Sequence, residues 1–291
     1  MDFVQTVRLH QKTECGSRVT PDRVTCPYVV PHAYEFNDVN EAQINRIARL
    51  NPASTWLIGN ECDRRDWKGG GQDEILPELY ALAYHEAYNW IKAADPTAKV
   101  AICGLIQASP LRLQYLARVW SAYETEFGVT MPVDVWNIHL FAIREVAGDW
   151  GADIPVGIEG VNQGAFLDWK NSHINMDVFA KQIRDFRKFM VDRGQIDKPL
   201  LVSEYGVLFG EDDFPDTQVH DFMVATFDHM MNTKDCTLST VDDCRLVQRW
   251  AWFSLADIEW GFNPHTTLYD VNTKNMTPAG EKIPTVHVGP L

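Results

Sequence analysis

Short apolar runs rich in β-branched residues alternate along this chain with longer segments of helical periodicity. The apolar runs cover residues 3–9, 54–60, 99–105, 133–139, 199–204 and 246–253. The segments between them carry apolar residues three and four positions apart, as amphipathic helices do. This alternation predicts βα units around a parallel sheet, and therefore an α/β protein.

The ends of several predicted helices are marked by capping residues. Asp38, with Glu41 three positions later, predicts a capping box and a helix that runs to about residue 50. Ser109 and Pro110 predict the start of another helix, and Gly128 predicts its end. Two later segments carry the apolar stripes that face a core, with Phe179, Ile183, Phe186 and Met190 on the first and Val219, Phe222, Thr226 and Met230 on the second.

We expect one domain over residues 1–291, because no internal repeat, low-complexity tract or Pro/Ser-rich linker interrupts the alternation. A closed eight-stranded barrel needs more βα units than the segment before residue 54 supplies. The sequence therefore predicts a TIM (β/α)8-type barrel that lacks its first one or two βα units and is incomplete at its N-terminus.

Charge and hydropathy exclude several partners. The 26 basic and 40 acidic side chains give a net charge of −14, and a field of that sign repels nucleic acid and anionic membrane surfaces. No run approaches the roughly 20 apolar residues that a membrane span requires. The first residues lack the basic and apolar regions of a secretory signal.

The six cysteines favour local disulfides over a metal site. Cys15 and Cys26 bracket one polar loop, and Cys236 and Cys244 bracket another, so we expect at least one of these pairs to be bonded. No pair has the spacing of a structural zinc site. Local pairs of this kind favour an oxidising compartment, and we expect an extracellular protein.

Two glutamates stand where predicted strands end. Glu61 follows the run 54–60, and Glu204 ends the run 199–204. In a parallel barrel both carboxyl ends lie at the active face, so we expect the two carboxylates to meet across its mouth. Trp56 and Trp67 are expected to desolvate Glu61 and suit it to donate a proton.

Glu204 is expected to stay ionised beside the hydroxyls of Ser203 and Tyr205. By strand alternation it should share an inward face with Val202 and Leu200. Aromatic rings near strand ends offer flat surfaces for sugars, and the candidates are Trp136, Phe141, Tyr205, Phe209, Trp250, Trp252 and Trp260. A pair of carboxylates with different acidities, flanked by such rings, is typical of glycoside cleavage.

Four segments together resemble the clan A glycoside hydrolases, which are (β/α)8 barrels. They are residues 56–61 (WLIGNE), 134–139 (DVWNIH), 200–206 (LLVSEYG) and 249–253 (RWAWF). The resemblance extends to residue 280 through the closing segments 268–272 and 277–280. In that clan an Asn-Glu pair ends the fourth strand, a second Glu ends the seventh, and a Trp ends the eighth.

This resemblance implies a role for each matching residue. Glu61 would be the acid/base and Glu204 the nucleophile. Asn60 would bind the sugar 2-hydroxyl, His139 would line the central subsite, and Trp252 would form its floor. Cys62 departs from the pattern, and a thiol so close to the acid/base could be oxidised or bridged.

The sequence thus predicts a retaining glycosidase that acts as a monomer and needs no cofactor or metal. The resemblance implies that its substrate is a β-linked oligosaccharide or polysaccharide. Its two carboxyl groups should lie about 5 to 5.5 Å apart. The subsites would be shaped by loops such as residues 144–168, which follow His139.

Two other interpretations remain open. A barrel with an open mouth would bind sugars without turnover, as a catalytically inactive carbohydrate-binding protein. A metal-dependent hydrolase would draw its ligands from His10, His32, His139, Glu61 or Asp63, but the chain carries no HxH or HxxxH cluster.

Overall fold

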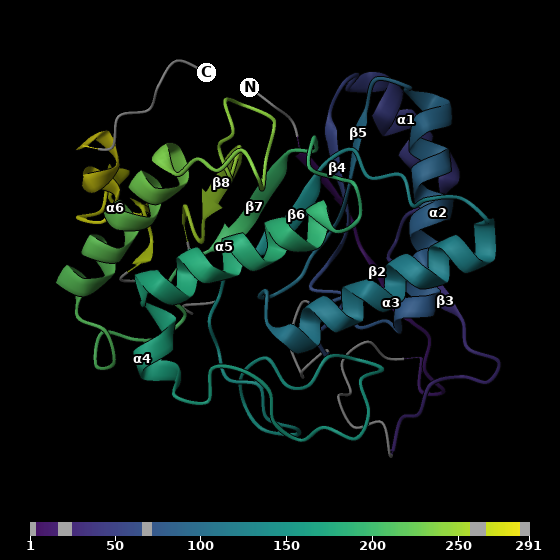
Figure 1. Ribbon diagram of the computed structural model, residues 1–291, viewed down its shortest axis with the longest axis horizontal. Helices are drawn as coiled ribbons and strands as arrows, with labels where there is room; N and C mark the ends of the chain where they lie inside the picture. Colours follow the sequence, from purple (N-terminus) through teal and green to yellow (C-terminus); the bar gives the residue numbers. More distant parts are fainter. Residues whose placement is uncertain (1–3, 17–24, 66–71, 257–265, 286–291) are drawn as a thin grey trace. The chain divides into compact units, whose positions relative to one another are not determined.

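The chain forms two structural units, and the computed structural model describes residues 4–16, 25–65, 72–256 and 266–285. The first unit comprises Met1–Ile138 and Arg144–Ala165, and the second comprises His139–Ile143 and Phe166–Leu291. Parallel strands and helices occur in each unit, which confirms the α/β class. Figure 1 shows the elements of both units.

The first unit is built on a parallel sheet. Its strands are β1 (Val4–Val7), β4 (Thr55–Asn60) and β5 (Lys99–Gly104), with β4 in the centre. Parallel bridges from Ala101 to Val135 and from Leu105 to Ile138 continue this pairing toward β6 (Trp136–His139). The β-branched and apolar residues of β4 and β5 are almost all buried, as expected of a parallel sheet that is covered on both faces.

Three helices of the first unit follow its strands, namely α1 (Glu41–Leu50), α2 (Pro77–Ala94) and α3 (Pro110–Phe127). Helix α2 packs against α1 and against α3 (Figure 1). Ser109 caps α3 by accepting a hydrogen bond from the Arg112 amide, and Gly128 ends it with a φ of +67°, as the sequence predicted.

The predicted cap of α1 was wrong. Asn40 accepts from the Gln43 amide while the Gln43 side chain accepts from the Asn40 amide, so the capping box lies two residues beyond the expected Asp38 and Glu41. Asp38 instead adopts a positive φ of 56° in the turn before the helix. Both pairs match the capping pattern, because Asn and Gln serve as well as Asp and Glu, and only the turn geometry decides between them.

The apolar run 3–9 is divided in the structure. Strand β1 ends at Val7, and β2 (Leu9–Gln11) pairs antiparallel with β3 (Tyr34–Phe36). The run is continuous in sequence, so its periodicity gives no signal of the change in partner.

The second unit has a parallel strand pair and its own helices. Strand β7 (Leu200–Tyr205) pairs with β8 (Arg249–Trp252), and α5 (Met176–Val191) packs against α6 (Asp216–Asn232). All eight predicted stripe residues of these two helices are buried. The remaining elements are short: α4 (Trp169–His173), β9 (Tyr269–Asp270), β10 (Asn275–Met276) and the 3-10 helix η2 (Gly280–Thr285).

A buried arginine ties α5 to the strand pair. Arg187 donates to the carbonyl oxygens of Leu246 and Lys198 and to the side chain of Gln248, at 2.6 to 2.9 Å. Burial lowers the pKa of Arg187 to about 10. These neutral acceptors satisfy the guanidinium, as a buried polar group requires.

Three disulfides are present. Cys15–Cys26 and Cys236–Cys244 are the two local pairs, so the prediction of at least one bond between them is confirmed. The third, Cys62–Cys103, joins residues 41 positions apart. It was not predicted as a pair, because the two cysteines meet only through the pairing of β4 with β5.

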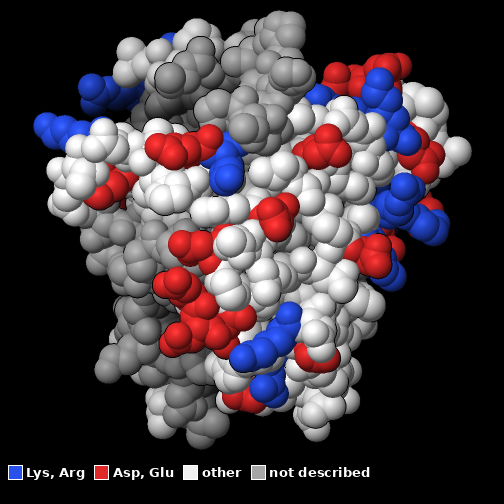
Figure 2. All heavy atoms as spheres, turned by 90° about the vertical axis from the view of Figure 1, so that its left-hand side faces the viewer, with Lys and Arg blue, Asp and Glu red and all other residues white. Residues whose placement is uncertain are grey.

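The acidic charge is visible at the surface. On the face shown in Figure 2, Asp and Glu side chains form a group near the centre, and Lys and Arg lie singly or in small groups around it. Within the described ranges, we find no helix with the length and apolar character to cross a bilayer.

Candidate active site

Glu61 directly follows the carboxyl end of β4. Its amide donates to the Gly104 carbonyl at 3.0 Å, which continues the pairing with β5. Its φ of +48° lies in the left-handed region and turns the chain out of the strand. The Glu61 side chain is only 6 % exposed and lies 3.0 Å from the guanidinium of Arg64. A non-glycine residue in this conformation costs on the order of 1 kcal/mol, and such residues cluster at functional sites.

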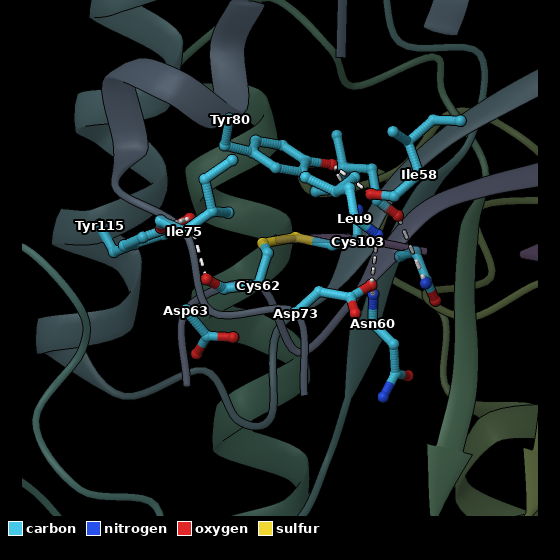
Figure 3. Close-up of a disulfide and its surroundings, with 12 residues drawn as sticks. Leu9, Ile58, Asn60, Cys62, Asp63, Asp73, Ile75, Tyr80, Cys103 and Tyr115 are labelled. Carbon is cyan, nitrogen blue, oxygen red and sulfur yellow. Dashed lines mark hydrogen bonds between the residues drawn. A yellow bond between two sulfur atoms is a disulfide. The ribbon is translucent and has the colours of Figure 1, made fainter. Parts of the chain in front are cut away.

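Asn60 is held by a buried carboxylate. The Asp73 side chain accepts from the amides of Asn60 and Leu9, at 2.9 and 3.2 Å, and the Asp73 amide donates to the Asn60 carbonyl (Figure 3). Arg8 pairs with the same carboxylate at 2.7 Å. Burial raises the pKa of Asp73 to about 6, although Arg8 acts against this rise. Asp73 thereby joins the segment after β1 to the end of β4.

The disulfide Cys62–Cys103 fixes the residue after Glu61 to β5 (Figure 3). Opposite Cys103, Gly59 has a φ of +92°, and a Cβ there would lie 3.2 Å from the Cys103 Cβ. At this point the Tyr80 hydroxyl bridges β4 and β5. It donates to the Ile58 carbonyl at 2.7 Å and accepts from the Cys103 amide at 2.8 Å. The segments on both sides of Asn60 and Glu61 are thus anchored to β5, one through Ile58 and the other through Cys62.

Arg112 of α3 is fully buried and binds the segment that follows Glu61. The Arg112 guanidinium pairs with Asp63 at 2.5 Å and with Glu145 at 3.0 Å, and all three side chains are 0 % exposed. It also donates to the carbonyl oxygens of Ala152 and Asp153. Arg112 therefore connects the segment after Glu61 to residues 144–165, which we call the 144–165 loop.

Glu204 stands in β7, where the register with β8 shifts. Val202 pairs with Trp250 and Tyr205 with Trp252, so β7 has one more residue than β8 in this interval. This irregularity places Val202 and Tyr205 on the same face of the pair. The prediction that Glu204 shares a face with Val202 and Leu200 was therefore wrong, because strict alternation does not hold across a bulge.

The hydroxyls expected to hold Glu204 point elsewhere. The Tyr205 hydroxyl contacts the Thr226 hydroxyl of α6 at 3.2 Å, and the hydroxyl of Ser203 has no hydrogen-bond partner among the described residues. In the second unit, His139 lies near the Glu204 carboxylate, with its Nδ1 3.8 Å away. The Leu140 amide also donates to the Glu204 carbonyl, which places the end of β6 beside β7 at this point.

Tyr205 and Trp252 belong to the core. The Tyr205 ring is 0 % exposed and packs against Phe179 and Trp252. The Trp252 ring also lies against Phe227 of α6, and its indole donates to the Thr266 carbonyl at 2.9 Å. Because both rings face the helices, we correct the sequence prediction and leave them out of the substrate site.

Phe253 directly follows β8. Its amide donates to the Tyr205 carbonyl at 2.8 Å, one residue beyond the end of the strand. The partly exposed Phe253 contacts Phe141 edge-to-face, and Phe141 contacts His139 in the same way. The sequence carries no local signal for this residue, because the face of β8 that meets α6 is decided by the tertiary structure.

The other predicted aromatic residues also differ in position. Trp136 is fully buried against Trp120 and is a core residue. Trp250 packs edge-to-face on Phe227, whereas the partly exposed Phe209 stacks on Trp169 at 4.0 Å. Trp67 and Trp260 lie outside the described residues.

His173 connects the segments that follow β6 and β7. Its Nδ1 faces the Ala142 carbonyl at 3.2 Å, and its Nε2 accepts from the Leu208 amide at 2.9 Å. This arrangement requires the neutral ring with the proton on Nδ1. Burial lowers the pKa of His173 to about 4, so a second proton is strongly disfavoured in the folded chain.

We expect stability to fall as the pH drops through the range set by this histidine. In the unfolded chain the ring takes up a proton near pH 6.5, whereas in the folded chain its pKa is about 4. Between these values the unfolded state binds more protons, so acidification costs up to about 3 kcal/mol of unfolding free energy.

His173→Gln tests this expectation, because glutamine can make both hydrogen bonds without titrating. The denaturation midpoint of this variant should change less between pH 7 and pH 4 than that of the wild type. His220→Gln, at a partly exposed position of α6, is the matched control. Identical pH dependence in the wild type and in His173→Gln would contradict the assignment.

Each unit therefore brings together part of the predicted site. The first unit holds Asn60 and Glu61 at the end of β4, and the second holds His139 and Glu204. The separation of the two glutamate carboxyl groups stays a prediction. Arg112 and Phe253 were not predicted as neighbours of the site, because their partners are distant in sequence. Arg64 was not predicted either, because its contact with Glu61, three positions away, depends on the left-handed backbone of Glu61.

No model of a known protein family matches this sequence, and no curated protein matches it. Solved structures do match it in part. They include a glucosidase from Croceicoccus marinus (15 % identity, 82 % of this chain and 42 % of that chain, TM-score 0.48). A monomeric beta-xylosidase from Caulobacter crescentus matches at 15 % identity over 83 % of this chain and 45 % of that chain, with a TM-score of 0.46.

An endoglucanase from the hyperthermophile Thermotoga maritima matches at 14 % identity, over 84 % of this chain and 64 % of that chain, with a TM-score of 0.46. All three matched proteins are glycoside hydrolases by name. The present chain spans less than two thirds of the length of each of them.

Proposed function

We propose that the protein is a retaining glycoside hydrolase with Glu204 as nucleophile and Glu61 as acid/base. One observation carries this proposal. Each glutamate lies at the carboxyl end of a strand that has a parallel partner, beside a side chain of its own unit that can carry positive charge, Arg64 for Glu61 and His139 for Glu204. Carboxylates at such strand ends form the active face in (β/α)8 enzymes.

The same proposal joins the two units in one domain. Residues 1–291 would form a TIM (β/α)8-type barrel that lacks its first one or two βα units. The two carboxyl groups would then lie about 5 to 5.5 Å apart, the spacing of retaining enzymes. Separations of roughly 6.5 to 9.5 Å would instead suit an inverting enzyme.

The reaction proceeds in two displacements. A Glu204 oxygen attacks the anomeric carbon while protonated Glu61 donates its proton to the departing glycosidic oxygen, and a glycosyl ester forms. Glu61, now ionised, takes a proton from water. That water attacks the anomeric carbon and breaks the bond to Glu204. These two displacements need no metal and no organic cofactor.

The remaining residues bind the sugar. Asn60 hydrogen-bonds the 2-hydroxyl, and His139 lines the central subsite beside Glu204. Phe253 forms the floor of that subsite. The substrate is a β-linked oligosaccharide or polysaccharide, and the protein acts as a monomer. Three disulfides support an oxidising, extracellular setting, since such bonds persist there.

The stereochemistry of the first product tests the mechanism. The protein is incubated with a panel of 4-nitrophenyl β-glycosides and β-linked polysaccharides, and the anomer released first is identified by proton NMR. A β-anomer supports retention, whereas an α-anomer contradicts it. Glycan binding without release of reducing sugar, over the whole panel, would support the binding-barrel interpretation.

A further inference from the structure

A single arginine links the candidate acid/base to the 144–165 loop. One guanidinium nitrogen of Arg64 lies 3.0 Å from the Glu61 carboxylate, and the other donates to the Gly151 carbonyl at 2.9 Å. From this bridge we propose that Arg64 is a positioning residue, which fixes the Glu61 carboxylate and makes its position depend on the loop. The inference rests on the function proposed above.

The geometry of Glu61 explains why such a residue is needed. The left-handed backbone of Glu61 directs its side chain away from the path of β4, and a carboxylate so little exposed requires a compensating partner. Arg64 is itself only 18 % exposed, so this ion pair is screened less than a surface pair. The planar fork of arginine reaches two acceptors at once, which a lysine cannot do with fixed geometry.

The loop gives Arg64 a fixed partner. Residues 145 and 165 pair through their backbones, and the Ala152 amide donates to the Arg144 carbonyl at 2.9 Å. Gly151 has a φ of +113°, and a Cβ at this position would collide with the Arg144 carbonyl oxygen. Arg112 donates hydrogen bonds to the carbonyl oxygens of the next two residues, Ala152 and Asp153. The Gly151 carbonyl is therefore a rigid acceptor rather than an adjustable one.

Arg64 also supplies charge. Within the first unit, Glu61 lies 3.0 Å from Arg64 and also acts electrostatically on Asp63, whose carboxylate pairs with Arg112. A positive charge in contact with a carboxylate favours its ionised form. Loss of Arg64 should therefore let Glu61 keep its proton to higher pH, in addition to leaving the carboxylate less well oriented.

Three variants separate these effects, namely Arg64→Ala, Arg64→Lys and Arg65→Ala. Arg65 is the matched control because it contacts the same loop, at Asp153 with 3.6 Å, through a partly exposed side chain. Each variant is first checked for its thermal midpoint. Then kcat/KM is measured against pH with the phenyl and 2,4-dinitrophenyl β-glycosides of the sugar that the wild type cleaves.

For Arg64→Ala we expect the alkaline limb of the pH profile to move up by about 1 pH unit. On the acidic plateau, kcat/KM for the phenyl glycoside should fall about 100-fold, the low end of what general acid catalysis contributes. The dinitrophenyl glycoside should lose less than about 3-fold, since its leaving group needs little protonation. Arg64→Lys should keep the alkaline limb at the wild-type pH and recover part of kcat/KM for the phenyl glycoside. Arg65→Ala should match the wild type in both respects.

Two results would overturn the inference while leaving the proposed function intact. One is an Arg64→Ala profile that matches that of Arg65→Ala. The other is an equal loss for both glycosides with an unmoved alkaline limb, which would assign Arg64 a structural role only. A wild type that cleaves no glycoside fails the proposed function itself, a result that is recognised before any variant is compared.

Discussion

Glu204→Gln is expected to lower kcat for aryl β-glycosides by on the order of 10⁴-fold or more, the scale of losing a covalent nucleophile. The amide keeps the size of the carboxylate but cannot attack the anomeric carbon. The change also leaves the contacts of Tyr205 with Thr226 and Phe227 of α6 in place. We therefore expect the thermal midpoint to stay near that of the wild type while turnover disappears. Steady-state kinetics on the best substrate of the panel measures this loss.

Added azide distinguishes the roles of the two glutamates. In Glu204→Ala, azide can attack the anomeric carbon directly from the face that the nucleophile leaves open, which gives the α-glycosyl azide. In Glu61→Ala the glycosyl ester still forms from an activated glycoside, and azide then attacks it from the opposite face to give the β-glycosyl azide. The same azide anomer from both variants, or unchanged activity in Glu204→Gln, would remove the proposed assignment.

Arg112→Met is expected to cost about 3 to 5 kcal/mol of unfolding free energy, the largest effect on stability that we predict. The substitution keeps much of the side-chain volume but leaves Asp63 and Glu145 buried together without a counter-charge. It also removes the donors to the 144–165 loop. Denaturant titration, with the transition followed by circular dichroism, measures the change.

Arg118→Met is the matched control on the same helix. Arg118 pairs with Glu78 at the surface, where both side chains are more than a third exposed, and it also donates one hydrogen bond to the Gly157 carbonyl of the 144–165 loop. Exposed pairs of this kind contribute about 0 to 1 kcal/mol, so the two variants should differ clearly. Equal destabilisation by both substitutions would show that the buried cluster contributes no more than a surface pair.

Local sequence signals were sufficient for most helices and for the strand cores. The α3 boundaries follow from Ser109, Pro110 and Gly128, whose capping preferences act within one turn of the helix. The strands that lead to Glu61 and Glu204 follow from continuous apolar runs, which only a sheet covered on both faces accommodates. The cap of α1 was misplaced because two overlapping pairs of residues satisfy the same rule.

The candidate site was predicted in part. The end of β4 at residue 60 was predicted correctly and that of β7 was placed one residue early, at 204 instead of 205; the residue types there suggested the chemistry. The contact of Trp252 with α6 was not recognisable from composition, because it depends on which face of β8 meets the helix. The bulge in β7 similarly decides which residues lie with Glu204, and a single inserted residue leaves no mark in the apolar pattern.

The sequence by itself determined the α/β class, the approximate ends of β4 and β7 and the two acidic residues found there, because periodicity and capping act between neighbours along the chain. Only the tertiary structure decided that Cys62 meets Cys103, that Arg112 holds two buried carboxylates, and that Arg64 joins Glu61 to Gly151. Apart from the pair of Arg64 with Glu61, which are three positions apart, these contacts join residues dozens of positions apart. Their partners are chosen by strand register and by the need to compensate buried charge, and neither is encoded in any short stretch of the chain.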